Sequence, residues 1–155
     1  MQVHEQVTKL DEILAEYESL RGLRPWKNVD ITRYVEMSSD ELRNLTREEL
    51  ALGVCSLAQF SLALQKELNK EKTRYDWAQG RIDLIYWRDC EKYRKDFQTK
   101  DERKGQIIVQ NDVLTKLHQV MCEAQNRMNR LNEIPEKIDG LRRAIENLCF
   151  IRKDQ

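Results

Sequence analysis

The chain has 155 residues, with 27 Lys and Arg against 27 Asp and Glu, so its formal net charge is zero. Five Gly and two Pro are too few turn-forming residues for an all-β or Rossmann-type chain, which favours an α-helical protein. A mean hydropathy of −0.77 leaves few apolar side chains for a compact core, and this indicates extended helices.

The first predicted element is a helix over residues 3 to 20. Its apolar residues recur in steps of four and three, which is the spacing of a helix face that packs against a partner. Gly22 and Pro25 then interrupt the pattern. We expect four apolar residues to attach the following loop to the core: Trp26, Ile31, Tyr34 and Val35.

Two capping boxes follow this loop. Ser38 with Glu41, and Thr46 with Glu49, each pair a hydroxyl at a helix start with a carboxylate three residues later that can return a hydrogen bond. They predict a short helix near 39–45 and a new helix from residue 47. We therefore divide the chain into a helical arm and loop over residues 1–45 and a body over residues 46–155.

The body begins with a long helix, predicted from Arg47 to about Phe97. Apolar residues keep the same three-four spacing through this segment, which contains no proline. About fifty residues would span roughly 75 Å, longer than a globular helix, so the segment indicates a coiled coil or a helical hairpin. Gly80, in its interior, marks either a close contact or a weak point.

The run KDERKG, Lys100–Gly105, is the polar break at which we expect the chain to reverse. A second long helix follows, and Pro135 should kink or restart it between two apolar stripes. The expected fold is all-α: a short N-terminal helical arm followed by two long antiparallel helices, forming a helical hairpin or coiled coil that assembles into an oligomer.

No motif of a catalytic site is present, so we expect neither an enzyme nor a cofactor. His118 and Cys122 lie one helical turn apart, but two ligands do not complete a zinc site, and no metal is expected. Glu67 and Glu71 lie among lysines and indicate a solvated, salt-bridged helix face. The four cysteines are widely spaced and predict reduced thiols.

The apolar runs and the first ten residues indicate where in the cell the protein is found. No apolar run approaches the ~18 residues that a membrane span requires, and the first ten residues lack the apolar segment of a signal peptide. We therefore expect no membrane association and a cytoplasmic location, which would be the host cytoplasm if a phage encodes the chain.

The charges are unevenly distributed along the chain. Residues 1–50 carry 7 basic and 11 acidic side chains, and residues 51–155 carry 20 and 16, so the two parts have net charges of −4 and +4. Basic residues alternate with aromatic rings near the end of the first long helix, as in proteins that bind single-stranded nucleic acid. The expected phosphate contacts are Arg81, Arg88, Lys92, Arg94 and Lys95, and the expected stacking rings, if exposed, are Trp77, Tyr86 and Trp87. Interleaved acidic residues keep a second interpretation open, in which this is a solvated face with its rings in the core.

Three segments carry a resemblance to a known family. Within Leu57–Tyr86, the element QGRIDLIY corresponds to a K-A-R-L-D-Y-Y type element. Further along the chain, Met128–Ile134 matches a V-N-x-L-x-x-I spacing. Near the end, Leu141–Glu146 matches a closing x-x-N-A-I-E segment. With these elements, the region from Thr46 to Lys153 resembles the UvsY-like recombination mediator proteins of tailed bacteriophages. Gln79 replaces a basic residue of the family pattern, so its DNA-contacting pair carries over to Arg81 alone.

The resemblance implies an all-helical homo-oligomer, such as a ring, that binds single-stranded DNA. It would contact a single-strand-binding protein and a RecA-like recombinase, and would help the recombinase replace the former on the strand. Oligomerisation would also cover apolar side chains that a thin hairpin leaves without partners. The expected contacts between copies are Leu141, Ile145, Leu148 and Phe150.

Two other functions remain open on the sequence. The first is a coiled-coil adaptor or assembly subunit whose apolar stripes serve only protein partners. The second is an inhibitor that a phage or mobile element directs at a host complex.

Overall fold

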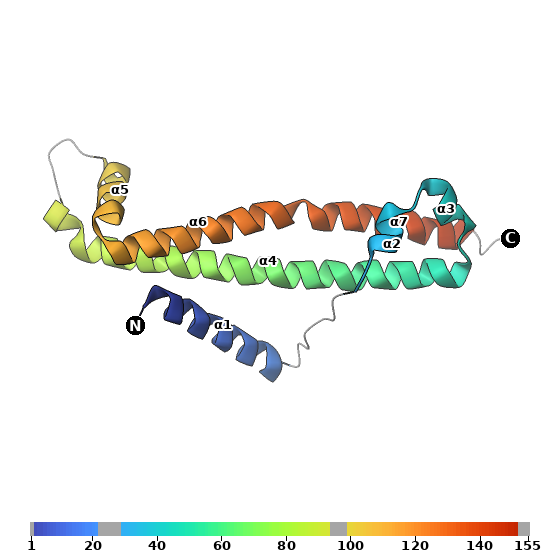
Figure 1. Cartoon of the computed structure of the whole chain (residues 1–155), viewed down its shortest axis with the longest axis horizontal. Helices are drawn as coiled ribbons and strands as arrows, with labels where there is room; N and C mark the ends of the chain where they lie inside the picture. Colours follow the sequence, from blue (N-terminus) through green and yellow to red (C-terminus); the bar gives the residue numbers. More distant parts are fainter. Residues whose placement is uncertain (1, 22–28, 94–98, 152–155) are drawn as a thin grey trace. The chain divides into compact units, whose positions relative to one another are not determined.

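The computed structural model describes residues 2–21, 29–93 and 99–151, and within these ranges every regular element is a helix. The predicted all-α class is confirmed. In chain order the elements are α1 (Val3–Leu20), α2 (Thr32–Glu36), α3 (Ser39–Asn44), α4 (Arg47–Asp89), the 3₁₀ turn η1 (Cys90–Tyr93), α5 (Lys100–Gln110), α6 (Asp112–Asn132) and α7 (Ile134–Ile151) (Figure 1).

Both predicted capping boxes form. The Ser38 hydroxyl accepts a hydrogen bond from the Glu41 amide at 3.3 Å, and the Glu41 carboxylate accepts one from the Ser38 amide at 2.7 Å. Thr46 and Glu49 repeat the exchange at 3.2 and 2.9 Å. Each box satisfies amides that a helix start leaves without an intrahelical partner, so α3 and α4 begin where the sequence predicts.

The KDERKG run forms the first half of a helix, so the prediction that it reverses the chain is wrong. Thr99 accepts from the Glu102 amide at 3.3 Å, and the Glu102 carboxylate accepts from the Thr99 amide at 2.9 Å. This third capping box begins α5, and Asn111 then separates α5 from α6. Charge content alone does not break a helix that has a good start.

The predicted restart at Pro135 is confirmed. Helix α6 ends at Asn132 and α7 begins at Ile134, which places Pro135 in the first turn of α7. A proline costs little there because its missing amide would have no intrahelical acceptor. Gly80, by contrast, marks no close contact, since nothing lies within 4 Å of where its Cβ would be.

The chain folds into two compact units that do not follow the predicted division at residue 45. One unit comprises residues 1–23 and 69–129, and the other comprises residues 24–68 and 130–155. We call them the α6 unit and the α7 unit. Helix α4 supplies its second half to the α6 unit and its first half to the α7 unit.

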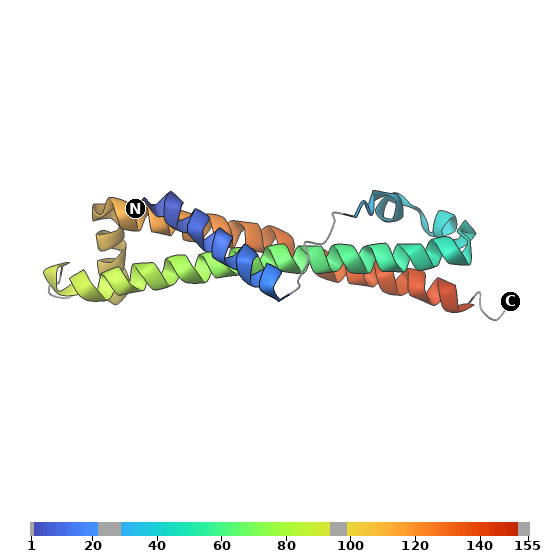
Figure 2. The ribbon, with the colours of Figure 1, turned by 90° about the horizontal axis from the view of Figure 1, so that it is seen from below.

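In the α6 unit, α6 lies alongside the second half of α4, and α5 crosses the end of this pair (Figures 1 and 2). A cluster of buried side chains from four helices and η1 holds these elements together. Three of its members, Ile82, Ile107 and Leu114, are at most 1% exposed, and burying each contributes about 1.5–3 kcal/mol. The cluster comprises Val3, Ile82, Tyr86, Cys90, Ile107, Leu114 and Leu117.

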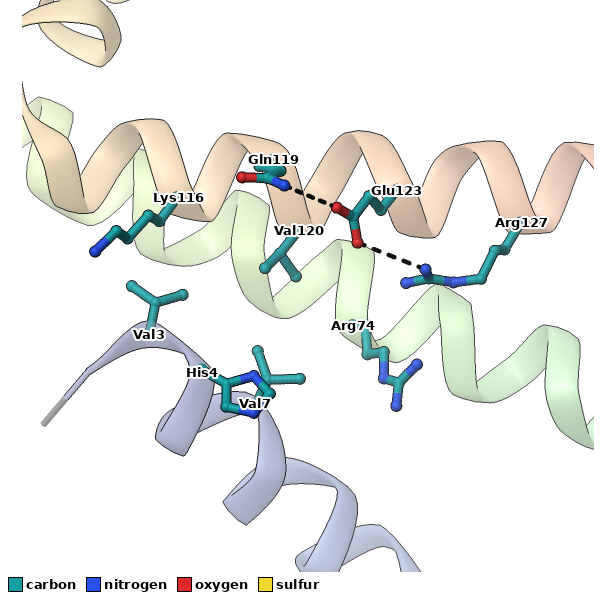
Figure 3. Close-up of a pocket in the computed structure, with 9 residues that line it drawn as sticks. All are labelled: Val3, His4, Val7, Arg74, Lys116, Gln119, Val120, Glu123 and Arg127. Atoms are coloured by element: carbon teal, nitrogen blue, oxygen red, sulfur yellow. Dashed lines mark hydrogen bonds and ion pairs between the residues drawn. The ribbon is translucent and has the colours of Figure 1, made fainter.

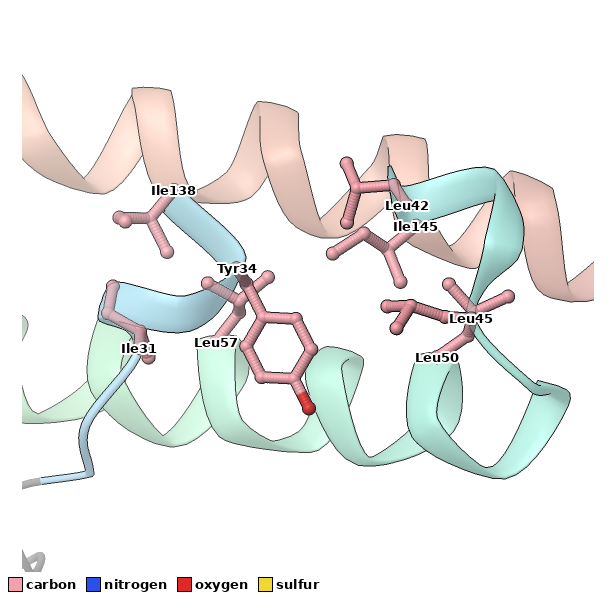
Figure 4. Packing of buried hydrophobic residues seen from close by; sticks show 8 residues of the cluster. All are labelled: Ile31, Tyr34, Leu42, Leu45, Leu50, Leu57, Ile138 and Ile145. Carbon is pink, nitrogen blue, oxygen red and sulfur yellow. The ribbon is translucent and has the colours of Figure 1, made fainter. Parts of the chain in front are cut away.

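The α7 unit has a core of its own (Figure 4). Leu50 and Leu57 of α4 pack with Ile138 and Ile145 of α7, and residues of the loop and of α2 and α3 cover them: Ile31, Tyr34, Leu42 and Leu45.

The structure tests the predicted burial of three of the four loop residues. Ile31 and Tyr34 are buried, as predicted, whereas Val35 is exposed. Successive residues of a helix point about 100° apart, and the orientation of α2 that buries Tyr34 turns Val35 toward solvent. Trp26 lies outside the described residues.

Candidate nucleic-acid interface

Four exposed side chains share one face of α4 in the α6 unit. Successive members lie three, three and one positions apart along the helix, and they are Arg81, Leu84, Trp87 and Arg88. The side chains of Leu84 and Trp87 are 65% and 63% exposed. We call these four residues the Trp87 face. It combines two guanidinium groups with an indole ring, the residue types that contact phosphates and unpaired bases.

The Trp87 ring already has two neighbours. The Lys100 ammonium, at the start of α5, lies 4.9 Å from the ring centroid, and the Tyr86 ring meets it edge-on with centroids 5.4 Å apart. A cation over an indole face is a favourable contact, worth about 0.5–1 kcal/mol at an exposed site. A base that stacks on the face under Lys100 would have to displace the ammonium, which could then meet the phosphate.

Asp89 pairs with two of the side chains that are predicted to contact phosphate. Its carboxylate accepts hydrogen bonds from Arg88, at 2.9 and 3.3 Å, and from Lys92, at 2.9 Å. Hydrogen bonding to Arg88, and then to Lys92, lowers the pKa of Asp89 to about 2. The three side chains therefore carry a single net positive charge at neutral pH.

A further ion pair joins α5 to α4. The Lys104 ammonium donates to the Asp83 carboxylate at 2.6 Å, and both side chains are partly shielded from solvent. The same end of the α6 unit thus carries several basic side chains with acidic partners. The interleaved charges of the sequence become, in this region, paired charges.

The predicted stacking rings do not share one environment. Tyr86 is 3% exposed and belongs to the α6-unit core, so the prediction that it offers a ring for stacking is corrected. Trp77 is partly buried against the same cluster. Only Trp87 of the three is exposed, because adjacent residues point about 100° apart and Tyr86 takes the inward position. Arg94 and Lys95 lie outside the described residues.

The predicted contacts between copies are also partly internal. Ile145 is fully buried in the core of the α7 unit, so it has no surface to offer a second copy, and that prediction is corrected. Leu141 and Leu148 pack against the same core from its edge. Phe150 is 62% exposed and is the member of this set with a largely open side chain. The helix spacing places Leu141, Ile145 and Leu148 on one stripe and Phe150 on the opposite side of α7, but it does not show which helix covers the stripe.

A second polar assembly of the α6 unit was missed by sequence reasoning. Glu71 is 5% exposed, and its carboxylate faces two guanidinium groups: Arg74 Nη1 at 2.7 Å and Arg127 Nε at 2.8 Å. Arg74 also donates two hydrogen bonds to Asp11 of α1. The prediction of a solvated face is thus wrong at Glu71, whose two partners lie on α4 and α6.

This ionic cluster attaches α1 to the rest of its unit. Hydrogen bonding to Arg74 lowers the pKa of the Asp11 carboxyl, and hydrogen bonding to Asp11 raises that of Arg74. Removing one member of a shielded, hydrogen-bonded group of this kind is costly because it leaves the opposite charge without its partner. The cluster therefore has a structural role in holding the arm.

A cavity of about 320 Å³ lies between α1, α4 and α6 beside this cluster (Figure 3). Val3, His4 and Val7 line it from α1, while α6 contributes a row of polar side chains. In that row Gln119 donates to Glu123 at 3.0 Å, and Glu123 pairs with Arg127 at 3.6 Å. Since both arginines of its wall are held by carboxylates, the cavity offers no unpaired guanidinium group to an anion.

Comparisons of the chain with protein-family models, with curated proteins and with solved structures found no match. Among the described helices, none combines the length with the apolar character that a membrane span requires.

Proposed function

We propose that the protein binds single-stranded DNA through the Trp87 face and acts as a recombination mediator of bacteriophage type. The observation that supports this best is the exposed indole of Trp87, which lies under the Lys100 ammonium of α5 and directly precedes the exposed Arg88 in the sequence. Unpaired bases stack on such rings without regard to sequence, while the cations neutralise phosphates.

The pairing of charges sets the expected strength of binding. Phosphate groups would compete with Asp89 for Arg88 and Lys92, so each copy would gain the equivalent of about two or three phosphate contacts. For single strands, a plot of the logarithm of the binding constant against the logarithm of the salt concentration falls by about 0.7 for each phosphate contact. Two or three contacts therefore predict a slope near −2. Binding would be weak for one copy and stronger for several copies on one strand.

The mediator role rests on this mode of binding together with the resemblance of residues 46–153 to the UvsY-like recombination mediators. In the proposed arrangement, the long helices form an antiparallel hairpin, and several copies assemble around one strand, with Phe150 among the contacts between copies. Such a homo-oligomer, in the host cytoplasm, would hold the DNA while a RecA-like recombinase replaces a single-strand-binding protein. The protein itself would need no nucleotide and no cofactor.

Fluorescence anisotropy with a labelled single-stranded oligonucleotide at increasing salt tests the binding. We expect Trp87→Ala to weaken it about fivefold or more, since stacking contributes roughly 1–3 kcal/mol per base. Asp89→Asn should instead strengthen binding and steepen the salt slope by about 0.7 per released cation, because it frees Arg88 and Lys92.

A matched pair of variants provides the control. Arg88 and Arg143 both have side chains that are 71% exposed and both pair with an aspartate at 2.9 Å, but Arg143 lies in the α7 unit. Arg88→Glu should weaken binding and Arg143→Glu should not. Equal effects of the two variants, or no binding at low salt, would exclude the Trp87 face as the DNA site.

The mediator role needs a separate assay. The rate of ATP hydrolysis by a RecA-like recombinase can be measured on a strand covered by its single-strand-binding protein, and the parent chain should raise that rate while Trp87→Ala should not. DNA binding without any effect on this rate would leave a single-strand binder that is not a mediator.

One observation favours the adaptor as a second candidate. Leu84 and Trp87 lie one turn apart and are both more than 60% exposed, which gives the same face an apolar centre that a protein partner could cover. Leu84→Gln separates the two functions. It should leave DNA binding almost unchanged under the first proposal, and it should abolish the protein contact under the second.

A further inference from the structure

Helix α1 is an acidic segment that packs on the basic part of its own unit. From Val3 to Leu20 it carries five acidic side chains and one basic side chain, a net charge of −4. Residues 69–129 of the same unit carry 13 basic and 10 acidic side chains, a net charge of +3. The arm therefore offsets the positive charge of the unit that carries the Trp87 face.

A row of side chains runs along one side of α4 in this unit. Its six members recur in alternating steps of four and three positions, which is the spacing of a single helix face. Within about 60° of the middle of this face, no residue of α4 between positions 69 and 89 is acidic. The members, which we call the α4 row, are Lys70, Arg74, Trp77, Arg81, Leu84 and Arg88. The last three of them belong to the Trp87 face.

Helix α1 covers the first half of the α4 row. Arg74 donates two hydrogen bonds to Asp11, and the charge of Lys70 adds to the effect of Arg74 in lowering the pKa of the Asp11 carboxyl. Trp77 packs against the cluster to which Val3 of α1 belongs. The second half of the row is exposed. An acidic helix thus lies on one half of a basic row, and the other half is open to solvent.

The arm buries little of its own surface. Val3 is the one residue of α1 that is buried, and the cavity of about 320 Å³ separates part of α1 from α4 and α6 (Figure 3). Three large apolar side chains in the second half of α1 stay exposed, namely Ile13 at 54%, Tyr17 at 54% and Leu20 at 79%. Release of α1 would therefore expose little additional apolar surface, and the ion pair with Arg74 is its main polar attachment.

The surface under α1 holds six charged side chains of other helices. Four are basic and two are acidic, so this surface keeps a net charge of +2 when the arm leaves. They are Lys70, Glu71 and Arg74 of α4, and Lys116, Glu123 and Arg127 of α6. The two carboxylates are engaged by the two arginines, whereas the two lysines form no ion pair with any described residue.

We propose that single-stranded DNA binds first to the open half of the α4 row and then displaces α1 from the other half. A phosphate group offers Arg74 two oxygen acceptors, as the Asp11 carboxylate does, and it also meets the charge of Lys70. From Lys70 to Arg88 the row spans about 27 Å, against about 11 Å for its open half. The arm is then a competitor that only a strand of sufficient length removes. This inference rests on the proposed DNA binding and adds a second half to its site.

Hydrogen–deuterium exchange of the full-length chain tests the displacement. The probe is an oligonucleotide of about 16 nucleotides, twice the number that follows 27 Å at about 3.4 Å each. An isolated helix as short as α1 is marginal in water, so we expect its amides to exchange at least about fivefold faster in the complex. The amides of α6 should keep their protection. Unchanged or slower exchange of α1 at saturation would overturn the proposal.

Two lysine substitutions in α1 form a matched pair. Asp11→Lys and Glu12→Lys change the charge of the arm equally, but Asp11 faces Arg74, whereas Glu12 is exposed and forms no ion pair with a described residue. In fluorescence anisotropy, Asp11→Lys should bind the oligonucleotide about fivefold more tightly than the parent chain. Glu12→Lys should gain less than about twofold, because salt screens a distant charge. Equal gains would assign the effect to net charge and overturn the proposal.

A second pair of variants tests the covered half of the row. Lys70 is half-buried beside α1, whereas Lys72 is exposed on the opposite side of α4. Lys70→Gln should weaken binding and reduce the salt slope by about 0.7, and Lys72→Gln should do neither. If Trp87→Ala weakens binding while Lys70→Gln and Asp11→Lys leave it unchanged, the DNA site stands and this inference alone is refuted. A parent chain that binds no oligonucleotide refutes both.

Discussion

Two glycines of α4 should respond in opposite directions to the same substitution. A Cβ added at Gly53 would lie 2.8 Å from Tyr34 Cε1 and 3.2 Å from Cδ1 and Cζ of the same ring, whereas one added at Gly80 would meet nothing within 4 Å. Both glycines lie inside one helix, so alanine brings the same gain in helix propensity at each, about 1 kcal/mol. Any difference in outcome reports on the Tyr34 ring.

The structure sets the size of the opposing effect. An ordinary contact is 3.4–4 Å, so the Tyr34 ring would have to withdraw by roughly 0.6 Å or more. The ring is 8% exposed, belongs to the α7-unit core, and its hydroxyl donates to the Glu49 carbonyl at 3.4 Å. Overpacking of this kind costs about 1–3 kcal/mol. We expect Gly53→Ala to lower the free energy of unfolding by about 1 kcal/mol and Gly80→Ala to raise it by about as much.

Urea denaturation followed by far-UV circular dichroism measures both effects, each variant being compared with the parent chain. A double-mutant cycle isolates the ring: in a Tyr34→Ala background, Gly53→Ala should become stabilising. Equal stabilisation by both single substitutions would refute the proposed contact. A loss at Gly53 that persists without the Tyr34 ring would refute its assignment to that ring.

Three further predictions concern the α7-unit core and the ionic cluster. Leu57→Ala removes a fully buried side chain and should cost about 2–5 kcal/mol in urea denaturation, whereas Leu52→Ala, at a position 63% exposed, should cost under ~1 kcal/mol. Arg74 lowers the pKa of Asp11 below its ordinary 3.8, so the pair stabilises the fold fully above that value and loses its effect as the pH falls through the lower folded-state pKa. Asp11→Asn should therefore remove part of the loss of stability in acid, and a denaturation midpoint that falls just as steeply in the variant would contradict this. Glu71→Gln leaves two guanidinium groups with one fewer carboxylate and should cost about 2 kcal/mol, and an unchanged urea midpoint would argue against the cluster.

Local signals in the sequence predicted the helices well. The capping boxes at Ser38 and Thr46 need only residues three positions apart, and Pro135 acts within one turn, so each could be interpreted without knowledge of the fold. The same signal at Thr99 and Glu102 is present in the sequence, but the charge of the following run favoured a turn instead. A good helix start outweighs a high charge content, and α5 could have been predicted on that ground.

Features that depend on distant partners could not be predicted. In the sequence, Glu71 resembles its solvated neighbours. Its carboxylate pairs with Arg127, which lies 56 positions later. Its other partner, Arg74, is held by Asp11, which lies 60 positions before Glu71. The choice between Tyr86 and Trp87 as the inward ring depends on Ile107 of α5 and on Leu114 and Leu117 of α6, which belong to the cluster that receives Tyr86. Periodicity identifies a stripe, but the helix that covers it is a property of the whole chain.

The interleaved course of the chain through its two units bears on the order in which they form. In the α6 unit, Ile82 and Leu117 of one cluster are separated by 35 positions, whereas Leu57 and Ile138 of the α7 unit are separated by 81. Closing the longer loop costs roughly 0.7 kcal/mol more in chain entropy. Once α4 and α6 have paired, most of that loop is already closed, so we expect the α6 unit to nucleate folding and the α7 unit to complete it. A destabilising substitution at Leu117 should then slow refolding, and one at Ile138 should mainly accelerate unfolding.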